Sequence, residues 1–119
     1  MRGIAHSTYA IGYDFGTLSA RAGVYDTRNG REVAQSSIPY AHGVMTSFQG
    51  KDLPPGWAMQ NPRDYLDALQ SLSADLLCLS GLDADHIIGV GVAFTSCTLL
   101  PVREMCIRDR ERRVAVVLL

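Results

Sequence analysis

The sequence contains few of the residues that mark specialised classes of protein. Its three cysteines, Cys78, Cys97 and Cys106, are odd in number and show no C-x-x-C spacing. Neither a disulfide framework nor a zinc site is therefore predicted, and a reducing cytoplasm fits this cysteine usage. No run of about 18 apolar residues occurs, and the first residues lack the apolar stretch of a secretory signal. The sequence thus predicts neither secretion nor a membrane-spanning segment.

An excess of charge of one sign is also missing. The formal net charge is -1 over 119 residues, with 47% hydrophobic and 19% charged residues. A protein that gathers nucleic acid or binds an anionic membrane usually carries a strong basic surface, so neither partner is expected here. The composition is that of one small globular domain, for which a small-molecule ligand is the better expectation.

Three strands are predicted at the start of the chain, over residues 9–15, 20–25 and 32–38. The first alternates apolar and other residues, which places Ile11, Tyr13 and Phe15 on one face. Between the second and third strands, Asn29-Gly30 is a strong hairpin signal, because both residues tolerate positive φ. Tight turns between all three strands predict an antiparallel meander.

A long surface loop is predicted over residues 39–60, where prolines, glycines and polar residues are scattered. A helix should then begin at Asn61-Pro62-Arg63-Asp64, since Asn61 can cap free N–H groups and Asp64 suits the positive end of the helix dipole. Gly81 would end it. Five leucines at three- and four-residue spacing predict the stripe that covers a sheet: Leu66, Leu69, Leu72, Leu76 and Leu79.

Residues 87–94 form a nearly continuous apolar run, which is typical of a strand buried on both faces. We expect this strand to be central in the sheet and parallel to the first. The order strand, strand, strand, helix, strand predicts an α/β protein with the partial ribonuclease H-like (actin-like ATPase) fold, of which β-β-β-α-β is the start.

The turn after the first strand is the best candidate for chemistry. Gly16 would let backbone N–H groups approach phosphate oxygens closely, and Thr17 and Ser19 add hydroxyl donors. Asp14, just before the turn, could hold Mg²⁺ directly or through water. The same residues could also form an ordinary hairpin corner, and Arg21 is a minor candidate for a phosphate contact.

A second polar segment, Thr95-Ser96-Cys97-Thr98, follows the apolar strand at the edge of the sheet where ligands bind in open α/β folds. From spacing alone, the hydroxyl groups could equally satisfy backbone groups in a turn. Cys97 has no histidine placed to activate it, so an inert thiol is the simpler interpretation.

Taken together, four stretches resemble the FGGY carbohydrate kinase family, and within it the enzymes that phosphorylate L-ribulose. They run in the family's order: residues 9–22 with the D-x-G-T turn, residues 40–45, residues 53–65 with W-A-x-Q-x-P, and residues 94–101 with F-T-x-C-T. The D-x-G-T turn is shared by a wider superfamily, whereas the last two strings are more specific.

The resemblance implies transfer of a phosphoryl group from ATP, with Mg²⁺, to the 5-hydroxyl of L-ribulose or a related ketose in L-arabinose catabolism. It implies a phosphate site at Gly12, Asp14, Gly16, Thr17 and Ser19, with Asp14 as the metal ligand, and a sugar site at Thr95, Ser96 and Cys97. It places the catalytic base and the adenine-binding domain later in the chain than these residues, so the 119-residue chain is expected to be inactive alone. The full-length parent enzyme could be a homodimer, but the sequence does not give its oligomeric state.

Two departures from the family pattern affect this interpretation. Ala93 stands where the family usually has Asp, and the pattern stops after Val102. We divide the chain into an extension (1–7), the first part of the kinase domain (8–102) and a tail (103–119) interpreted as translated adapter sequence; a natural charged helix is the alternative. Another FGGY pentulose or hexulose kinase, or a small non-catalytic nucleotide-binding module, are the rival functions.

Overall fold

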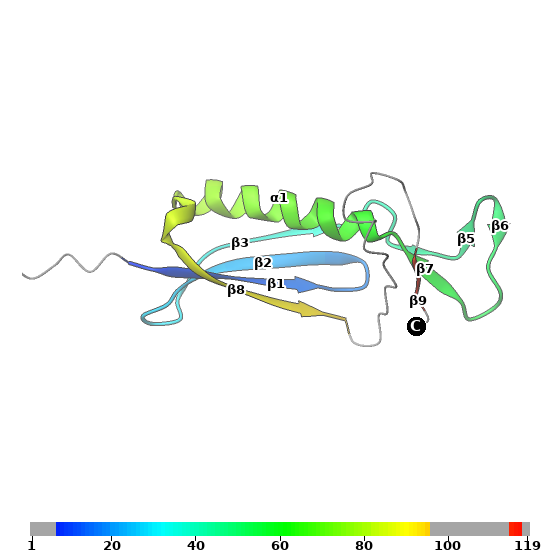
Figure 1. The fold of residues 1–119 in the computed structure, drawn as a ribbon, viewed down its shortest axis with the longest axis horizontal. Helices are drawn as coiled ribbons and strands as arrows, with labels where there is room; N and C mark the ends of the chain where they lie inside the picture. The colour runs from blue at the N-terminus through cyan, green and yellow to red at the C-terminus, as the bar shows by residue number, and fades with distance from the viewer. Residues whose placement is uncertain (1–6, 96–114, 118–119) are drawn as a thin grey trace, which may run out of the picture.

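The computed structural model describes residues 7–95 and 115–117, which form a main sheet with one long helix across one of its faces (Figure 1). A group of short strands lies beyond the end of this sheet. The elements are β1 (Tyr9–Phe15), β2 (Ser19–Asp26), β3 (Glu32–Pro39), β4 (Val44–Met45), β5 (Ser47–Phe48), β6 (Lys51–Asp52), β7 (Ala58–Gln60), α1 (Pro62–Ser80), the 3-10 helix Ala84–His86, β8 (Ile87–Phe94) and β9 (Ala115–Val117).

The main sheet has the strand order β3-β2-β1-β8. The first three strands are antiparallel neighbours, and β8 returns beside β1 and runs parallel to it. This confirms the predicted meander and the parallel fourth strand. The turn between β2 and β3 is a hairpin in which Gly30 alone takes a positive φ, of 71°, while the Asn29 side chain accepts a hydrogen bond from the Arg31 N–H (2.8 Å).

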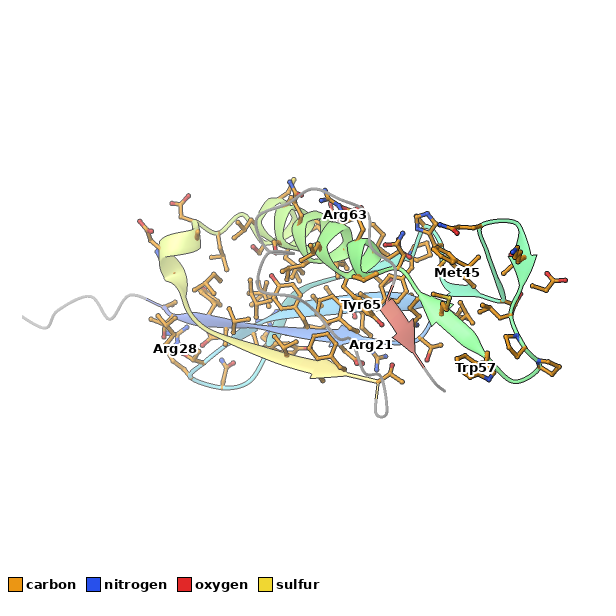
Figure 2. The ribbon with its side chains drawn as sticks, turned by 45° about the vertical axis from the view of Figure 1, so that its right-hand side comes forward. Arg21, Arg28, Met45, Trp57, Arg63 and Tyr65 are labelled. Carbon is orange, nitrogen blue, oxygen red and sulfur yellow. The ribbon has the colours of Figure 1, made fainter. Side chains whose placement is uncertain are left out.

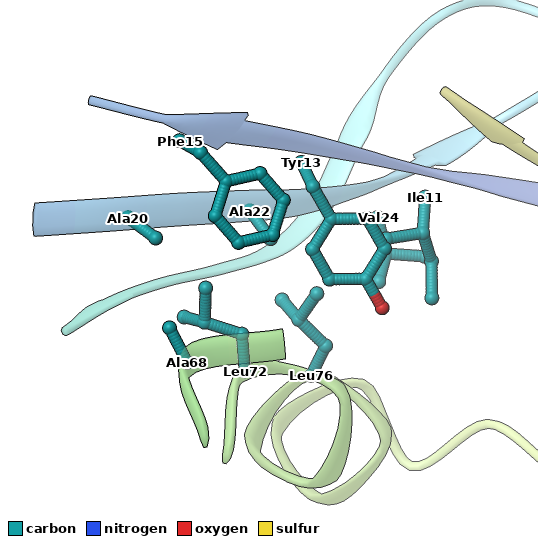
Figure 3. Close-up of a cluster of buried hydrophobic side chains, with 9 residues drawn as sticks. All are labelled: Ile11, Tyr13, Phe15, Ala20, Ala22, Val24, Ala68, Leu72 and Leu76. Atoms are coloured by element: carbon teal, nitrogen blue, oxygen red, sulfur yellow. The ribbon is translucent and has the colours of Figure 1, made fainter. Parts of the chain in front are cut away.

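The hydrophobic core lies between α1 and the strands β1 and β2 (Figure 3). The predicted face of β1 points into it, since Ile11, Tyr13 and Phe15 are all buried. Leu72 and Leu76 of the helix meet them and are 0% exposed. Burying a side chain of this size contributes roughly 1.5–3 kcal/mol relative to leaving it in water, so this cluster is the main source of stability.

The ends of α1 confirm the capping chemistry expected from the sequence. The Asn61 side chain accepts a hydrogen bond from the Arg63 N–H (3.0 Å), and Pro62 occupies the first turn. At the other end Gly81 takes the left-handed conformation, with φ of 66°, and its N–H donates to the Leu77 carbonyl (3.0 Å). No helix in the described part of the chain is long and apolar enough to cross a membrane.

The leucine stripe predicted for α1 is only partly correct. Leu72 and Leu76 are buried, but Leu66, Leu69 and Leu79 are 59%, 38% and 63% exposed. The buried face instead follows strict four-residue spacing and includes two smaller or polar positions, Asp64 and Ala68. Leu69 lies one position from this line and stays at its rim, whereas Leu66 lies two positions from both Asp64 and Ala68 and therefore faces away from the sheet.

The loop predicted over residues 39–60 also needs correction, because it contains short strands. β5 and β6 form a small hairpin, and β4, β7 and β9 form a second sheet in that order. Met59 and Gln60 in β7 are buried, at 5% and 3% exposed. Such two- and three-residue strands carry too little alternation to be detected in a sequence rich in glycine and proline.

The prediction that β8 is central and buried on both faces is wrong for the described residues. β8 is an edge strand, and Val90, Val92 and Phe94 are 63%, 53% and 61% exposed. Their register partners in β1 are Ile11, Tyr13 and Phe15, so they project from the same face as the core. α1 packs mainly against β2 and β3, so among the described residues it does not cover the β8 side of that face.

Candidate phosphate-binding turn

The turn between β1 and β2 lies where both β1 and β8 end. It is closed by the Gly16 N–H, which donates to the Ser19 carbonyl at 2.9 Å. A Cβ atom at position 16 would lie 3.0 Å from that carbonyl oxygen, which is tighter than real Cβ contacts normally allow. Glycine is therefore sterically favoured at this position, because any larger residue would require the Ser19 carbonyl to shift, which adds a structural reason to the expected functional one.

Asp14 is engaged by Arg21, its direct cross-strand partner in β2. The Arg21 Nε donates to Asp14 Oδ2 at 2.8 Å, and the terminal nitrogen lies 2.7 Å from the same oxygen. Both side chains are substantially exposed, at 43% for Asp14 and 76% for Arg21, so the pair contributes little to stability. Figure 2 shows Arg21 at the turn end of the sheet and Arg28 at the opposite end.

Gln60, the glutamine of the W-A-x-Q-x-P string, holds the turn from the outside, although it was not among the predicted site residues. Its Nε2 donates to the Thr17 carbonyl at 2.7 Å, and its Oε1 accepts a hydrogen bond from the Tyr65 hydroxyl. The neighbouring Leu18 carbonyl accepts from the Tyr40 N–H (2.9 Å). Two consecutive carbonyls of the turn are thus held by residues from β7 and the start of the 40–45 segment, which orients the turn relative to α1.

Thr95, the one described residue of the second predicted segment, lies at the same place. The Thr95 N–H and hydroxyl both donate to the Phe15 carbonyl, at 2.9 and 3.1 Å. Phe15 also stacks on Phe94, with ring centroids 5.0 Å apart, and Tyr65 meets both rings edge-on. Ser96 and Cys97 lie outside the described residues, so their predicted contacts with a sugar stay predictions.

Gly12 lies in the middle of β1, two residues before Asp14, and is not part of the turn. Its register partners are Gly23 in β2 and Gly91 in β8, so three adjacent strands carry glycine in one row. The Tyr25 ring lies over this row: a Cβ atom at Gly23 would be 2.7 Å from the Tyr25 hydroxyl oxygen. This gives Gly23 a packing reason that is independent of nucleotide, whereas a Cβ atom at Gly12 would make an ordinary contact at 3.9 Å and one at Gly91 would meet nothing within 4 Å.

Asp64 was predicted to interact favourably with the dipole at the start of α1, and the structure gives it a second role as a hydrogen-bond acceptor. Its carboxylate is buried and accepts hydrogen bonds from the N–H of His42 (3.0 Å) and Gly43 (3.3 Å), and it contacts His42 Nδ1 at 2.8 Å. It therefore binds the 40–45 segment to the helix. Burial raises the pKa of the adjacent Tyr40 well above its usual range, and the Tyr40 hydroxyl has no hydrogen-bond partner among the described residues.

Asp14 is suitable as one ligand of a magnesium ion. Both contacts with Arg21 involve Oδ2, so Oδ1 is available to a cation or to a metal-bound water. Magnesium commonly takes one or two carboxylates and completes its shell with phosphate oxygens and water. In the part of the chain that the structure describes, no cluster of three or more His, Cys, Asp or Glu residues could hold a metal by itself.

Comparison by sequence connects the chain with sugar kinases. It is 44% identical over 97 residues to a protein named ribulokinase from Shouchella clausii, covering 79% of this chain and 17% of that protein. The ribulokinase of Halalkalibacterium halodurans is 44% identical over 99 residues, covering 81% and 18% respectively. The chain thus spans less than a fifth of the length of these relatives. No model of a known protein family matches it.

Comparison with solved structures gives the fold. Gluconate kinase from Lactobacillus acidophilus superposes with a TM-score of 0.67 at 24% identity, covering 93% of this chain and 19% of that one. Xylulose kinase from Rhodospirillum rubrum gives 0.66 at 22% identity, covering 92% and 20%. The predicted fold class is therefore confirmed: the described residues form part of the actin-like ATPase fold found in these kinases.

Proposed function

We propose that this chain, a homologue of part of the ribulokinases with the fold of the FGGY sugar kinases, belongs to an ATP-dependent kinase that phosphorylates L-ribulose. Since the chain spans 17% of the first relative, the activity is proposed for an enzyme of which it forms one segment. The observation that carries the proposal is the Phe15 carbonyl, which joins the end of the Asp14 strand to Thr95. This contact supports a shared site, because it holds Thr95, the first residue of the second predicted segment, beside the strand that carries Asp14.

On this proposal the turn binds the phosphates of ATP. The N–H groups of the turn and the hydroxyls of Thr17 and Ser19 donate to phosphate oxygens, and Gly16 admits them without a side chain in the way. Asp14 holds Mg²⁺, which neutralises charge on the transferred phosphoryl group when bound. Gly12 lies two residues before Asp14 on the same face of β1, beside the Tyr25 ring, and places no side chain there.

The sugar would bind beside this turn, at Thr95, Ser96 and Cys97. Thr95 already uses its hydroxyl proton in the bond to Phe15, so it orients the segment rather than donating to the substrate. Ser96 is then the first choice for a hydrogen bond to a sugar hydroxyl. A hydroxyl on a segment fixed by two bonds to the neighbouring strand loses little freedom on binding, which favours specificity.

The proposal can be tested in a chimera. Residues 8–95 of this chain replace the matching segment of the Halalkalibacterium halodurans ribulokinase, and ADP release is followed with L-ribulose and MgATP. We expect an active chimera whose kcat/KM falls by about 100-fold or more with Asp14→Asn, because a charge-stabilising ligand is lost. Asp83→Asn is the matched control, since Asp83 is exposed and its side chain makes no capping bond. A folded chimera whose activity survives Asp14→Asn would contradict the proposal.

A second candidate is a kinase for a different sugar. It is favoured by the solved structures that superpose on the chain, which are kinases named for gluconate and xylulose. Offering the chimera L-ribulose, xylulose and gluconate separates the two. A preference for L-ribulose that is lost with Ser96→Ala, while MgATP binding is unchanged, supports the first candidate; the same preference with Ser96→Ala silent would remove Ser96 from the site.

A further inference from the structure

Two hydrogen bonds connect the start of α1 to the candidate phosphate-binding turn. The Tyr65 hydroxyl donates to Gln60 Oε1, and Gln60 Nε2 donates to the Thr17 carbonyl at 2.7 Å. A carbonyl oxygen can only accept, so the amide nitrogen of Gln60 must face Thr17, and its oxygen is left for the hydroxyl. Figure 2 shows Tyr65 at the turn end of the main sheet. We call these two consecutive bonds the Tyr65–Gln60 relay.

The relay begins at residues that the fold holds in place. Gln60 precedes the helix N-cap Asn61, and Tyr65 is the fourth residue of the helix. A contact between these two positions commonly fixes the angle at which the chain enters a helix. The Tyr65 ring also meets Phe15 and Tyr40 edge-on, with ring centroids 5.8 and 5.3 Å away. The hydroxyl is therefore presented to Gln60 by a ring that packing has already fixed.

The relay sets the direction of one backbone donor in the turn. The peptide bond between Thr17 and Leu18 is trans, so the Thr17 carbonyl and the Leu18 N–H share a plane and point in opposite directions. Because Gln60 in β7 holds this carbonyl, the Leu18 N–H points away from β7. Within residues 7–95 and 115–117, this N–H donates to no backbone carbonyl. It is therefore a free donor that Gln60 orients from the other side of the peptide plane.

We propose that Gln60 and Tyr65 are positioning residues for nucleotide, which orient the Leu18 N–H toward a phosphate of MgATP without contacting it themselves. This inference rests on the proposed function, since it concerns the same turn. Tyr65 acts only through Gln60, because among the described residues its hydroxyl bonds the amide of Gln60 and no group of the turn. Tyr13 offers a matched comparison away from the turn, since its hydroxyl lies 2.6 Å from Ser73 Oγ of α1.

The first test needs no nucleotide and uses the full 119-residue chain. The Gly16 N–H closes the turn on the Ser19 carbonyl, and its hydrogen exchange is followed by NMR relative to that of the Val24 amide in the core. Tyr65→Phe should raise this ratio about 5-fold, because a hydrogen bond that resists local opening of the turn is lost. Tyr13→Phe removes a tyrosine hydroxyl bond between sheet and helix and should leave the ratio within about 2-fold. Equal changes with the two substitutions would overturn the proposal.

The second test separates nucleotide from sugar in the chimera of residues 8–95 with the Halalkalibacterium halodurans ribulokinase. Calorimetric titration should show MgATP binding weakened about 10-fold by Gln60→Met and about 5-fold by Tyr65→Phe. The KM for L-ribulose should stay within about 2-fold, because the Phe15 carbonyl that holds Thr95 is not part of the relay. The double variant should bind MgATP no more weakly than Gln60→Met alone, since Tyr65 acts through Gln60.

Two further results would contradict the proposal. Additive losses in the double variant would mean that Tyr65 and Gln60 act independently. Equal weakening of MgATP binding by Tyr13→Phe would mean that general destabilisation is responsible. Failure of the proposed function is distinguishable from both, because the unsubstituted chimera would then bind MgATP without phosphorylating L-ribulose. The exchange ratios and the titrations need no sugar, so they would still decide whether the relay orients the turn.

Discussion

The two halves of the main sheet are built from similar strands and differ in what covers them. On the β2 side, Val24 is 0% exposed beneath α1, and its neighbours Ala20 and Ala22 are 1% and 5% exposed. On the β8 side, Val90 is 63% exposed although it projects from the same face of the same sheet. Burial of a valine is therefore decided here by the position of one helix and not by the strand's own pattern.

This difference divides the sheet into a stabilising half and an exposed half. The helix contacts β2 and β3, and the cluster around Leu72 joins it to β1 (Figure 3). β8 adds a strand and backbone hydrogen bonds to β1, but its apolar side chains remain largely in water. Hydrophobic stabilisation is roughly proportional to the apolar area removed from water, so equal residues contribute unequally in the two halves.

The largest expected effect tests this division directly. Leu72→Ala should destabilise the chain by about 2–5 kcal/mol, because Leu72 is fully buried and the helix cannot collapse onto the sheet to fill the cavity. Val90→Ala should change stability by no more than about 0.5 kcal/mol. Urea unfolding followed by circular dichroism, at a concentration too low for association, measures both. Similar losses for the two variants would show that β8 is covered in solution.

A smaller effect is expected in the row of glycines that crosses both halves. Gly23→Ala should destabilise by about 1 kcal/mol, since the new Cβ atom would lie 2.7 Å from the Tyr25 hydroxyl and the ring must move. Gly91→Ala meets no atom within 4 Å and should be neutral or stabilise by up to about 0.5 kcal/mol, because alanine restricts the unfolded chain. Both are read from urea midpoints.

The double variant Gly23→Ala, Tyr25→Ala is the control for the contact between Gly23 and the Tyr25 ring. Removal of the ring should cancel the penalty of the added methyl group, so the double variant should be no less stable than Tyr25→Ala alone. An unchanged penalty in the absence of the ring would show that the backbone at Gly23, and not the tyrosine, requires glycine.

The smallest expected effect concerns the hairpin that closes the covered half. Hydrogen bonds from the Arg28 side chain and N–H lower the pKa of Asp26 from 3.8 to about 2. A lowered pKa in the folded chain stabilises it above the unfolded value, so this contribution should be complete above about pH 4 and lost as the pH falls toward 2. The difference in urea midpoint between wild type and Asp26→Asn should narrow over that range. A difference in urea midpoint that stays constant between about pH 4 and pH 2 would contradict a stabilising role for the ionised Asp26 carboxylate.

Local chemistry explains what could be predicted from the sequence. The bounds of β1 followed from period-two alternation, and both ends of α1 followed from Asn61, Pro62 and Gly81, whose roles depend only on nearby backbone groups. The candidate phosphate-binding turn could be selected for the same reason, because its glycine, hydroxyl and carboxylate residues are close in sequence. Features that neighbouring residues determine are visible in a single sequence.

Features set by distant residues could not be predicted. The Gln60–Thr17 hydrogen bond spans 43 residues, and the contacts of Asp64 with His42 and Gly43 span 22 and 21. The apolar run of β8 correctly indicated a strand, but its burial could not be predicted, because a pattern does not reveal which element, if any, covers the strand. The leucines of α1 at the rim of the helix were assigned to the core for the same reason.

The side-chain amide of Gln60 has one allowed orientation, with a consequence for chemical ageing of the protein. Its nitrogen must face the Thr17 carbonyl and its oxygen must face the Tyr65 hydroxyl. Hydrolysis of the amide to a carboxylate would leave the tyrosine bond intact but set an acceptor against the carbonyl of the turn. A change of a single atom type, almost without change in volume, would thus release the turn while leaving the hydrophobic core untouched.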